Sequence, residues 1–222
     1  MRVLHVQHQD DCPPGLVGER LAELGADQLV VDARDPLLDP TGFDLVVTLG
    51  SDDSAADESV PYLRREWELL ARAVRANVPV LGICFGAQLL CRVLGGMVRP
   101  APGGPEIGWL RVDTTEPDLV EPGPWLVWHL DLMEPGPEST VVARTDVGVQ
   151  AFRHGPHLGV QFHPEATLAS VRVWAERYRG SLDRLGLDPT ALLEETERRA
   201  AQARARLDAL VDRMLARAGV GV

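Results

Sequence analysis

Residues 80–88 read VLGICFGAQ, and the order of residues in this stretch sets the expected fold. The stretch opens with a short apolar run that is typical of a buried strand, and a helical pattern begins directly after it. Gly82 stands two positions before Cys84, and Gly86 stands two positions after it. A sharp turn from strand to helix needs small neighbours of this kind, and it makes the residue at its apex project from the strand end. The stretch therefore predicts a strand–turn–helix unit with a cysteine at the turn.

The chain on both sides of this unit alternates short apolar runs with amphipathic segments. The pattern predicts strands at residues 2–6, 29–31, 45–49, 78–83, 147–153 and 158–162, and helices at residues 16–24, 62–75, 85–94 and 168–178. The second of these helices carries apolar residues at helical spacing, namely Leu63, Trp67, Leu70 and Val74. The alternation predicts an α/β protein with an open, mostly parallel central sheet and helices on both of its faces.

Residues 100–140 differ from this pattern, because proline and glycine are frequent there and the apolar runs are short. Runs at 109–112 and 125–128 predict short strands and hairpins, which would form a small inserted antiparallel region. Residues 189–218 are rich in Ala, Arg, Glu and Leu and predict a long C-terminal helix. We expect one domain over residues 1–222, with residues 185–222 as a helical extension that packs on it through Leu and Val.

Composition narrows the class of protein. The chain has 22 basic and 33 acidic residues and a formal net charge of −11, which disfavours nucleic acid as a partner because phosphate binding needs a basic face. The N-terminus lacks the apolar core of a signal peptide, and no apolar run could span a bilayer, so we expect a cytoplasmic protein without a membrane partner. The three cysteines, Cys12, Cys84 and Cys91, lack the spacing of zinc sites or disulfide frameworks, so no metal is predicted.

Cys84 is the candidate nucleophile. It would stand at the first turn of a helix, where the positive end of the helix dipole favours the thiolate form of a cysteine. The backbone N–H of Phe85 would point the same way and could bind a developing oxyanion. A free cysteine is often only a small core residue, and we expect this of Cys91, and of Cys12 unless it lies in a loop. The paired glycines favour the catalytic interpretation for Cys84.

Residues 158–165, LGVQFHPE, carry the second signal. Pro164 holds the preceding His163 in an extended conformation and prevents the strand from continuing, so His163 is expected at the end of a buried strand. If this strand runs parallel to the one before Cys84, both side chains lie at the sheet edge where ligands bind in open α/β proteins. His163 could then take the thiol proton, and Glu165 could orient the imidazole.

In this order and at this separation, the two motifs resemble those of the class I, or triad-type, glutamine amidotransferases. The resemblance is to stand-alone members related to the amidotransferase domain of GMP synthase. It extends to residues 106–109, 128–131 and 150–153, which read EIGW, WHLD and QAFR. It implies a flavodoxin-like fold and covers roughly the whole chain, with the C-terminal helix as its least specific part.

The resemblance also implies roles for single residues. Cys84 corresponds to the nucleophile, His163 to the general base and Glu165 to the third member of the triad. The backbone N–H groups of Phe85 and Ser51 correspond to the oxyanion hole. The positions implied for substrate binding are Gln88, Gly50, His129 and Asp131.

Two departures from the family pattern affect these expectations. Ser51 and Asp52 stand where the family has Gly and Pro in the oxyanion loop. Since serine tolerates positive φ poorly, the conformation of this loop is in question. Leu130 stands where related proteins have glycine between His129 and Asp131, which puts the choice of substrate or acceptor in question.

The chemistry implied is hydrolysis of the glutamine side-chain amide through a Cys84 thioester, with no metal or organic cofactor. Either a separate synthase subunit accepts the ammonia or the enzyme hydrolyses its substrate outright, because no P-loop or G-x-G-x-x-G follows a predicted strand in this sequence. Two alternatives stay open. The same triad could hydrolyse other γ-glutamyl amides or peptides, or the chain could be a non-enzymatic regulatory or binding protein on the same fold.

Overall fold

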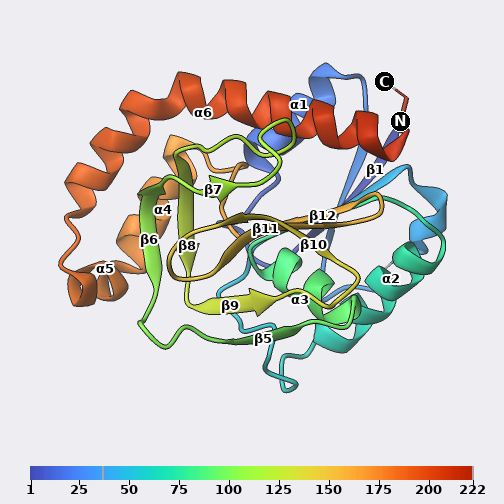
Figure 1. Ribbon diagram of the computed structural model, residues 1–222, viewed down its shortest axis with the longest axis horizontal. Helices are drawn as coiled ribbons and strands as arrows, with labels where there is room; N and C mark the ends of the chain where they lie inside the picture. The colour runs from blue at the N-terminus through green and yellow to red at the C-terminus, as the bar shows by residue number, and fades with distance from the viewer. Residues whose placement is uncertain (37, 222) are drawn as a thin grey trace.

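An eight-stranded sheet runs through the middle of the computed structural model, which describes residues 1–36 and 38–221 (Figure 1). The strands in chain order are β1 (Arg2–Gln7), β2 (Asp27–Asp32), β3 (Leu45–Thr48), β4 (Val80–Ile83), β5 (Met97–Pro100), β6 (Glu106–Leu110), β7 (Asp113–Thr114), β8 (Trp125–His129), β9 (Asp131–Glu134), β10 (Thr140–Arg144), β11 (Val149–His154) and β12 (His157–Val160). The helices are α1 (Gly15–Glu23), the 3-10 helix η1 (Pro40–Gly42), α2 (Leu63–Arg75), α3 (Phe85–Val93), α4 (Leu168–Arg177), α5 (Arg179–Leu185) and α6 (Pro189–Ala218).

The strand order of the central sheet is β2-β1-β3-β4-β12-β11-β10-β7. The first five strands pair in parallel, and the remaining three extend the sheet by antiparallel pairing. β4 lies between β3 and β12, with Ile83 opposite Val160. Because parallel strands end at the same edge, the residues that follow β3, β4 and β12 gather there. The predicted α/β fold with a mostly parallel, flavodoxin-like sheet is confirmed.

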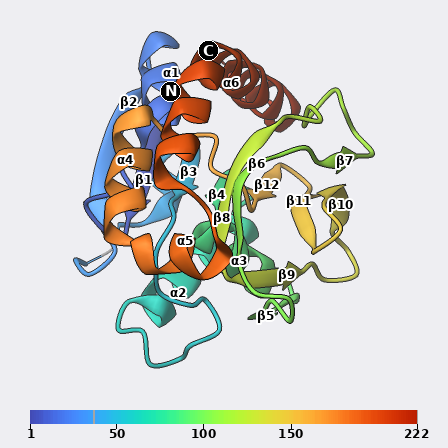
Figure 2. The ribbon, with the colours of Figure 1, turned by 90° about the vertical axis from the view of Figure 1, so that its left-hand side faces the viewer.

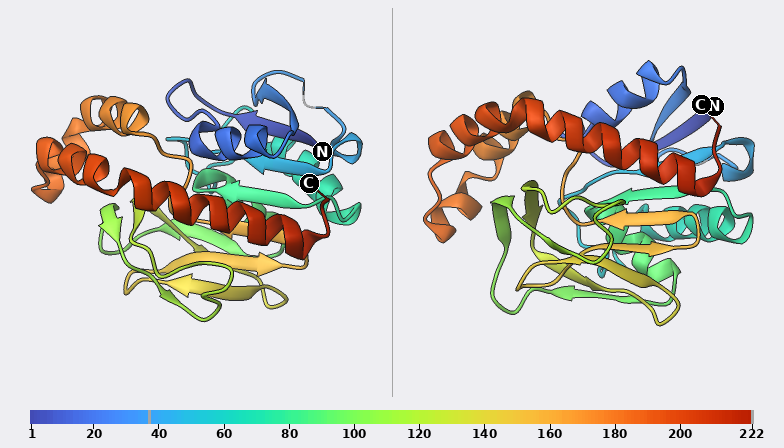
Figure 3. Two further views of the ribbon diagram at one scale, coloured as in Figure 1. Left: turned by 90° about the horizontal axis from the view of Figure 1, so that it is seen from above. Right: turned by 45° about the horizontal axis from the view of Figure 1, so that its top comes forward.

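Helices cover both faces of this sheet, as predicted (Figure 3). α1 and the C-terminal half of α6 share a core cluster with Val3 and Val47 on one face. α2 and α3 share a second cluster with Leu4 and Val46 on the other face. Neighbours along a strand fall into different clusters because successive side chains of a strand point to opposite faces. The edge of the sheet at which β3, β4 and β12 end therefore lies between two helical layers.

The region between α3 and β10 contributes two further antiparallel pairs, β5 with β9 and β6 with β8. β6 begins at Glu106, three residues before the apolar run predicted there. Ile107 of β6 and Leu126 of β8 pack against Trp174 of α4 and Leu192 of α6 in a third core cluster. Figure 2 shows α5 and the N-terminal part of α6 beside this strand pair. The insertion thus adds a wall that faces the C-terminal edge of the parallel strands.

The C-terminal helix α6 has the bounds that its composition predicts. The side chain of Asp188 accepts a hydrogen bond from the Thr190 N–H at the N-terminus, and Gly219 ends the helix in a left-handed conformation. Its buried stripe packs on the domain through Leu207, Leu210, Val211, Met214 and Leu215. Val222 lies outside the described residues. No helix in the described part of the chain is long and apolar enough to cross a membrane.

The apolar residues at helical spacing in α2 do not coincide with its buried face throughout. The side chain of Trp67 is 40% exposed, whereas Glu66, one position earlier, is fully buried. A buried carboxylate is stable only when it is paired and hydrogen-bonded, and Glu66 contacts His8 and Thr48. Apolar periodicity cannot reveal the burial of Glu66, because its partners His8 and Thr48 come from distant segments of the chain.

Candidate active site

Cys84 lies at the apex of the turn between β4 and α3. Its φ of 50° and ψ of −108° are unusual for a residue other than glycine, and such strained positions cluster at functional sites. A Cβ atom at Gly82 would lie 2.7 Å from the carbonyl oxygen of Gly86, and one at Gly86 would lie 2.2 Å from that of Thr48. Both positions therefore require glycine, as the sequence motif predicts. The turn presents the thiol to a pocket.

His163 and Glu165 form a hydrogen-bonded pair just beyond β12. His163 Nδ1 lies 2.7 Å from Glu165 Oε1, and both side chains are buried. The backbone N–H of His163 donates to the carbonyl oxygen of Leu126 at 2.7 Å, and this hydrogen bond fixes the segment against β8. Burial alone would lower the pKa of His163, but the negative charges of Glu165 and Cys84 outweigh it and raise the pKa well above its usual value. The imidazole is thus held in one orientation and favours the protonated form.

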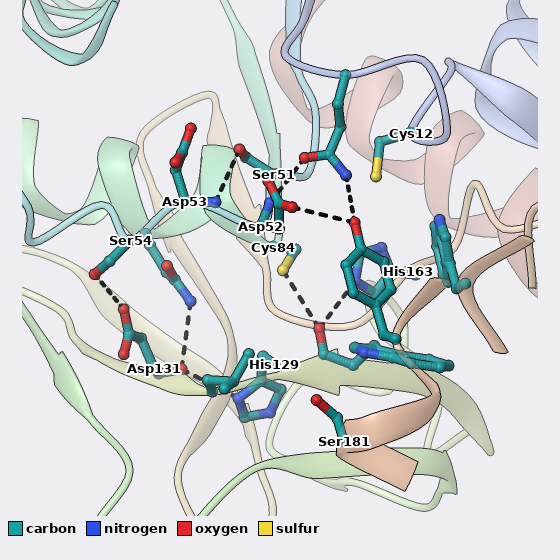
Figure 4. A pocket seen from close by; sticks show the side chains of 16 residues that line it. Cys12, Ser51, Asp52, Asp53, Ser54, Cys84, His129, Asp131, His163 and Ser181 are labelled. Atoms are coloured by element: carbon teal, nitrogen blue, oxygen red, sulfur yellow. Dashed lines mark hydrogen bonds between the residues drawn. The ribbon is translucent and has the colours of Figure 1, made fainter. Parts of the chain in front are cut away.

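The thiol and the imidazole meet at the carbonyl oxygen of Trp128 (Figure 4). Cys84 Sγ lies 3.7 Å from this oxygen, and His163 Nε2 lies 3.3 Å from it. Gly50, after β3, approaches both groups: a Cβ atom there would lie 3.3 Å from His163 Cε1 and 3.8 Å from Cys84 Cβ. The structure therefore brings together the ends of three parallel strands, and with them the residues of both sequence motifs.

The other two cysteines differ from Cys84 in their surroundings. Cys91 is buried inside α3, and burial raises the pKa of its thiol to about 12. Cys12 is buried in the loop after β1 and lines the same pocket as Cys84. Burial, helped by the nearby charge of Glu165, raises the pKa of the Cys12 thiol far above its usual value. Both side chains therefore stay as neutral thiols at neutral pH.

The loop after β3 holds the second backbone N–H that the sequence assigned to an oxyanion hole. Among the described residues, the only non-glycine residues with positive φ are Asn77 and Cys84. Ser51 therefore occupies its position without the strain that its replacement of glycine suggested. Phe85 is the first residue of α3, so its N–H has no partner within the helix. Phe85, which carries the first N–H, follows Cys84 in the chain, and Ser51, which carries the second, follows Gly50.

A pocket of about 280 Å³ opens beside Cys84. It is lined by Gln9, Cys12, Ser51, Asp52, Asp53, Ser54, Cys84, Gln88, Trp128, His129, Leu130, Asp131, His163, Trp174, Tyr178 and Ser181 (Figure 4). The amide of Gln88 donates to Gln161 Oε1 at 3.1 Å and to the carbonyl oxygen of Asp131 at 3.3 Å. Gln161 Nε2 in turn lies 3.6 Å from Cys84 Sγ. These two glutamines form the floor under the thiol.

His129 and Asp131, at the turn from β8 to β9, play different parts in the geometry. His129 Nδ1 lies 3.1 Å from the carbonyl oxygen of Asp131, and its Nε2 lies 3.1 Å from Glu106 Oε2 and 3.3 Å from Gln150 Nε2. The three segments that supported the family resemblance thus meet at this buried imidazole. Both of its nitrogens contact protein groups, so His129 supports the pocket wall from behind.

Asp131 and Leu130 lie nearer the opening. The carboxylate of Asp131 accepts a hydrogen bond from the hydroxyl of Ser54, across the pocket from the His163 side (Figure 4). The side chain of Leu130 is 54% exposed on the rim. The larger residue at position 130 therefore adds an exposed apolar side chain to the lining of the pocket.

Sequence reasoning missed part of the lining. Tyr178, at the end of α4, accepts a hydrogen bond from Gln9 Nε2 at 3.0 Å, and Gln9 Oε1 accepts one from the N–H of Asp52 at 2.9 Å. The first of these contacts joins segments more than a hundred residues apart, and no local motif marks either one.

Within the described part of the chain, no group of three or more His, Cys, Asp or Glu side chains is placed to hold a metal ion.

Comparison with protein families gives one match that spans the site. A sequence profile described as glutamine amidotransferase class-I matches residues 17–172, which include Cys84, His163 and Glu165. Among solved structures, a glutamine amidotransferase from Thermotoga maritima superposes with a TM-score of 0.88 at 30% sequence identity. The superposition covers 97% of this chain and 98% of that one. The similarity thus extends over the fold as a whole.

Curated relatives are similar at the sequence level. One subunit of the glutamine-hydrolysing GMP synthase of Saccharolobus solfataricus is 31% identical over 159 residues, covering 68% of this chain and 82% of the subunit. The glutamine-hydrolysing GMP synthase of Aeropyrum pernix is 36% identical over 158 residues. That match covers 68% of this chain but only 30% of the longer enzyme. The chain therefore corresponds in length to the subunit and to one part of the longer synthase.

Proposed function

The chain belongs to the class I glutamine amidotransferase family, and on that premise we propose that it hydrolyses the side-chain amide of glutamine to glutamate and ammonia. The observation that carries the proposal is the meeting of Cys84 Sγ and His163 Nε2 at one carbonyl oxygen, with Glu165 on the other nitrogen of the ring. A nucleophile, a base and a group that orients the base form the minimum set for acyl transfer.

The first half of the proposed reaction forms a thioester. The thiolate of Cys84 attacks the amide carbon, and the carbonyl oxygen becomes an oxyanion that the N–H groups of Phe85 and Ser51 stabilise. Removal of one such donor typically costs about 3 kcal/mol of transition-state stabilisation. The Nε2 proton of His163 passes to the amide nitrogen, the C–N bond breaks, and ammonia leaves.

The second half releases the product. His163, now neutral, accepts a proton from a water molecule, and the resulting hydroxide attacks the thioester carbon. The C–S bond breaks, glutamate leaves and the thiolate of Cys84 is restored. Glu165 holds the ring in the orientation that both steps require, and its charge stabilises the imidazolium.

We propose that Gln88, Gly50, His129 and Asp131 shape the part of the pocket that receives the substrate. Gly50 leaves room for the γ-carbonyl next to the thiol, since a Cβ atom there would contact both reacting side chains. Gln88 and His129 act through the pocket floor and wall, because the amide nitrogen of Gln88 and both ring nitrogens of His129 already contact other protein atoms. Asp131 lies at the entrance, where its carboxylate could accept a hydrogen bond from an ammonium group of the substrate.

We further propose that a separate synthase subunit uses the ammonia. The support is the match to a protein named as one subunit of a GMP synthase, which covers 82% of that subunit. Transfer of the released ammonia to a product requires such an acceptor. Stimulation of glutamine hydrolysis by the purified partner would support this part of the proposal.

A second candidate is hydrolysis of other γ-glutamyl amides. The observation that favours it is the charge of the pocket, whose described lining contains Asp52, Asp53 and Asp131 and no arginine. Such a lining attracts substrates whose leaving group is a charged amine. Measuring product release from glutamine and from γ-glutamyl amines, side by side, separates the two candidates, because the acyl half of the reaction is the same.

The test of the main proposal is covalent labelling with a diazo-ketone analogue of glutamine, followed by mass spectrometry. We expect one adduct on Cys84, formed more slowly when glutamine is present. Cys91→Ser, a change at a buried cysteine of the same helix, is the matched control and should label normally, whereas Cys84→Ser should not. Absence of the adduct with candidate partners present would favour a non-enzymatic role on this fold.

A further inference from the structure

A second histidine–glutamate pair lies behind the candidate active site. His8, directly after β1, has its Nε2 atom 2.8 Å from Oε2 of Glu66 in α2, and both side chains are fully buried. The hydroxyl of Thr48, at the end of β3, donates to Oε1 of the same carboxylate. The proposed mechanism makes no use of this pair.

The other nitrogen of His8 binds the loop after β3. Nδ1 of His8 lies 3.1 Å from the carbonyl oxygen of Gly50. A carbonyl oxygen can only accept, so Nδ1 carries the proton of this hydrogen bond. The carbonyl belongs to the peptide that joins Gly50 to Ser51, which is the peptide whose N–H is the proposed second oxyanion donor. In a trans peptide the C=O and N–H bonds point in opposite directions, so an oxygen held toward His8 turns the N–H away from it.

The neighbouring N–H groups of this loop are already used. Asp52 donates to Gln9 Oε1 at 2.9 Å, and Asp53 donates to the hydroxyl oxygen of Ser51 at 3.2 Å. The N–H of Ser51, in contrast, donates to no atom of residues 1–36 or 38–221. Ser51 also lines the pocket that contains Cys84. A free donor in this place is what an oxyanion site requires.

The same imidazole packs against the residue that carries the first donor. The ring of His8 lies edge-on to Phe85 with a centroid distance of 4.7 Å, and 5.2 Å from the ring of Tyr62. The hydroxyl of Tyr62 in turn lies 2.8 Å from Oγ of Ser51. One buried side chain thus touches both halves of the proposed oxyanion hole.

We propose that His8 and Glu66 are positioning residues that hold the Gly50–Ser51 peptide with its N–H toward the substrate carbonyl. Glu66 acts by fixing the ring of His8 through Nε2, and Thr48 fixes Glu66. The inference rests on the proposed function, because an oxyanion donor affects only a reaction that forms a tetrahedral intermediate. Neither residue contacts substrate.

The test uses the double variant His8→Phe/Glu66→Leu, which removes both partners and so leaves no unpaired buried charge. Phenylalanine keeps the ring packing but cannot bind Gly50. Loss of a whole oxyanion donor lowers kcat by roughly 10²- to 10³-fold, and a misdirected donor should lower kcat by about 10- to 100-fold with little change in KM. Glu66→Gln, which keeps the size of the side chain, should give a smaller loss in the same parameter and provides a second variant if the first does not fold.

His5→Phe is the matched control, because His5 is also fully buried on β1 but its side chain bonds Gln28 on the far side from the loop. Two further measurements separate the possible results. Alkylation of Cys84 by iodoacetamide forms no oxyanion and should stay at the wild-type rate, while hydrogen exchange of residues 49–53 should become faster in the double variant alone. An unchanged kcat in the variants, or equal losses of kcat and alkylation rate, would overturn the inference. Inactive wild-type protein would instead contradict the proposed function, and the exchange measurement would still test whether His8 holds the loop.

Discussion

Two buried histidine–glutamate pairs lie next to Gly50 in space, and they differ in what the second ring nitrogen faces. In the pair His163–Glu165, Nε2 lies 3.3 Å from the carbonyl oxygen of Trp128, which Cys84 Sγ also approaches, at the wall of an open pocket. In the pair His8–Glu66, the second nitrogen is bound to the carbonyl oxygen of Gly50. The same two side chains therefore give a group that can exchange a proton with substrate in one place and a fixed support in the other.

The carboxylates show the same contrast. Both oxygens of Glu66 are hydrogen-bonded, to His8 and Thr48, whereas Oε2 of Glu165 has no hydrogen-bond partner among the described residues. A buried network whose polar atoms are all hydrogen-bonded favours one rigid arrangement. A carboxylate with one unbonded oxygen can still stabilise a positive charge that appears nearby during the reaction. Burial and residue type alone would not separate the two pairs.

The largest expected effect is at the pair that faces the pocket. His163→Ala should lower kcat for glutamine on the order of 10⁶-fold, because both proton transfers are lost, and Cys84→Ser should do the same. Circular dichroism should show a folded protein in each case. Steady-state ammonia release is the measurement. A loss no greater than that of the His8→Phe/Glu66→Leu variant would remove the distinction between the two pairs.

Glu165→Ala should have a smaller effect than His163→Ala, since Glu165 orients the ring and does not exchange protons with substrate. Loss of the acid of a triad typically lowers kcat by roughly 10⁴-fold, about a hundred times less than loss of the base or nucleophile. Comparing kcat for the two variants under the same conditions checks the order. Equal losses would mean that Glu165 takes part in the chemistry directly.

The contrast between the pairs also explains what the sequence could predict. Cys84 with its flanking glycines, and His163 with Pro164 and Glu165, are local patterns, because the turn geometry and the ring orientation are set within a few residues. The strand pattern supplies the rest, since parallel neighbours must end at one edge. The α/β class, the sheet and the bounds of the C-terminal helix follow from periodicity and capping of the same local kind.

What could not be predicted depends on contacts between distant segments. His8 and Glu66 are 58 positions apart, and neither is marked by a motif. Trp67 belongs to the apolar spacing of α2 but is exposed, whereas Glu66 is buried, because His8 from a distant segment hydrogen-bonds its carboxylate. The same holds for the pocket wall formed by Tyr178, whose contact with Gln9 spans 169 positions.

Gly50 connects the two pairs, and Gly50→Ala should have an intermediate effect on activity. The added Cβ would lie 3.3 Å from His163 Cε1, which is a tight contact, so the ring must shift by a few tenths of an ångström. A displacement of reacting groups by about 1 Å can lower the rate by about 100-fold, so we expect a loss of about 3- to 30-fold. Gly103→Ala is the control, because its Cβ would meet no atom within 4 Å. Wild-type activity in Gly50→Ala would show that the ring position tolerates movement.

The smallest effect concerns stability, and its sign follows from the raised pKa of His163. Burial acts to lower this pKa, but the charges of Glu165 and Cys84 raise it well above the usual value of 6.5. The folded state therefore favours the protonated ring. Its contribution to the free energy of unfolding is complete below about pH 6.5 and is lost as the pH rises through the raised value. In urea unfolding, the stability difference between wild type and His163→Gln should be largest near pH 6 and should narrow as the pH rises through the raised pKa of His163. His5 and His157, whose pKa burial lowers to about 4, contribute equally in both proteins and cancel. A difference that widens with pH would mean that the imidazole beside the thiol is held in its neutral form.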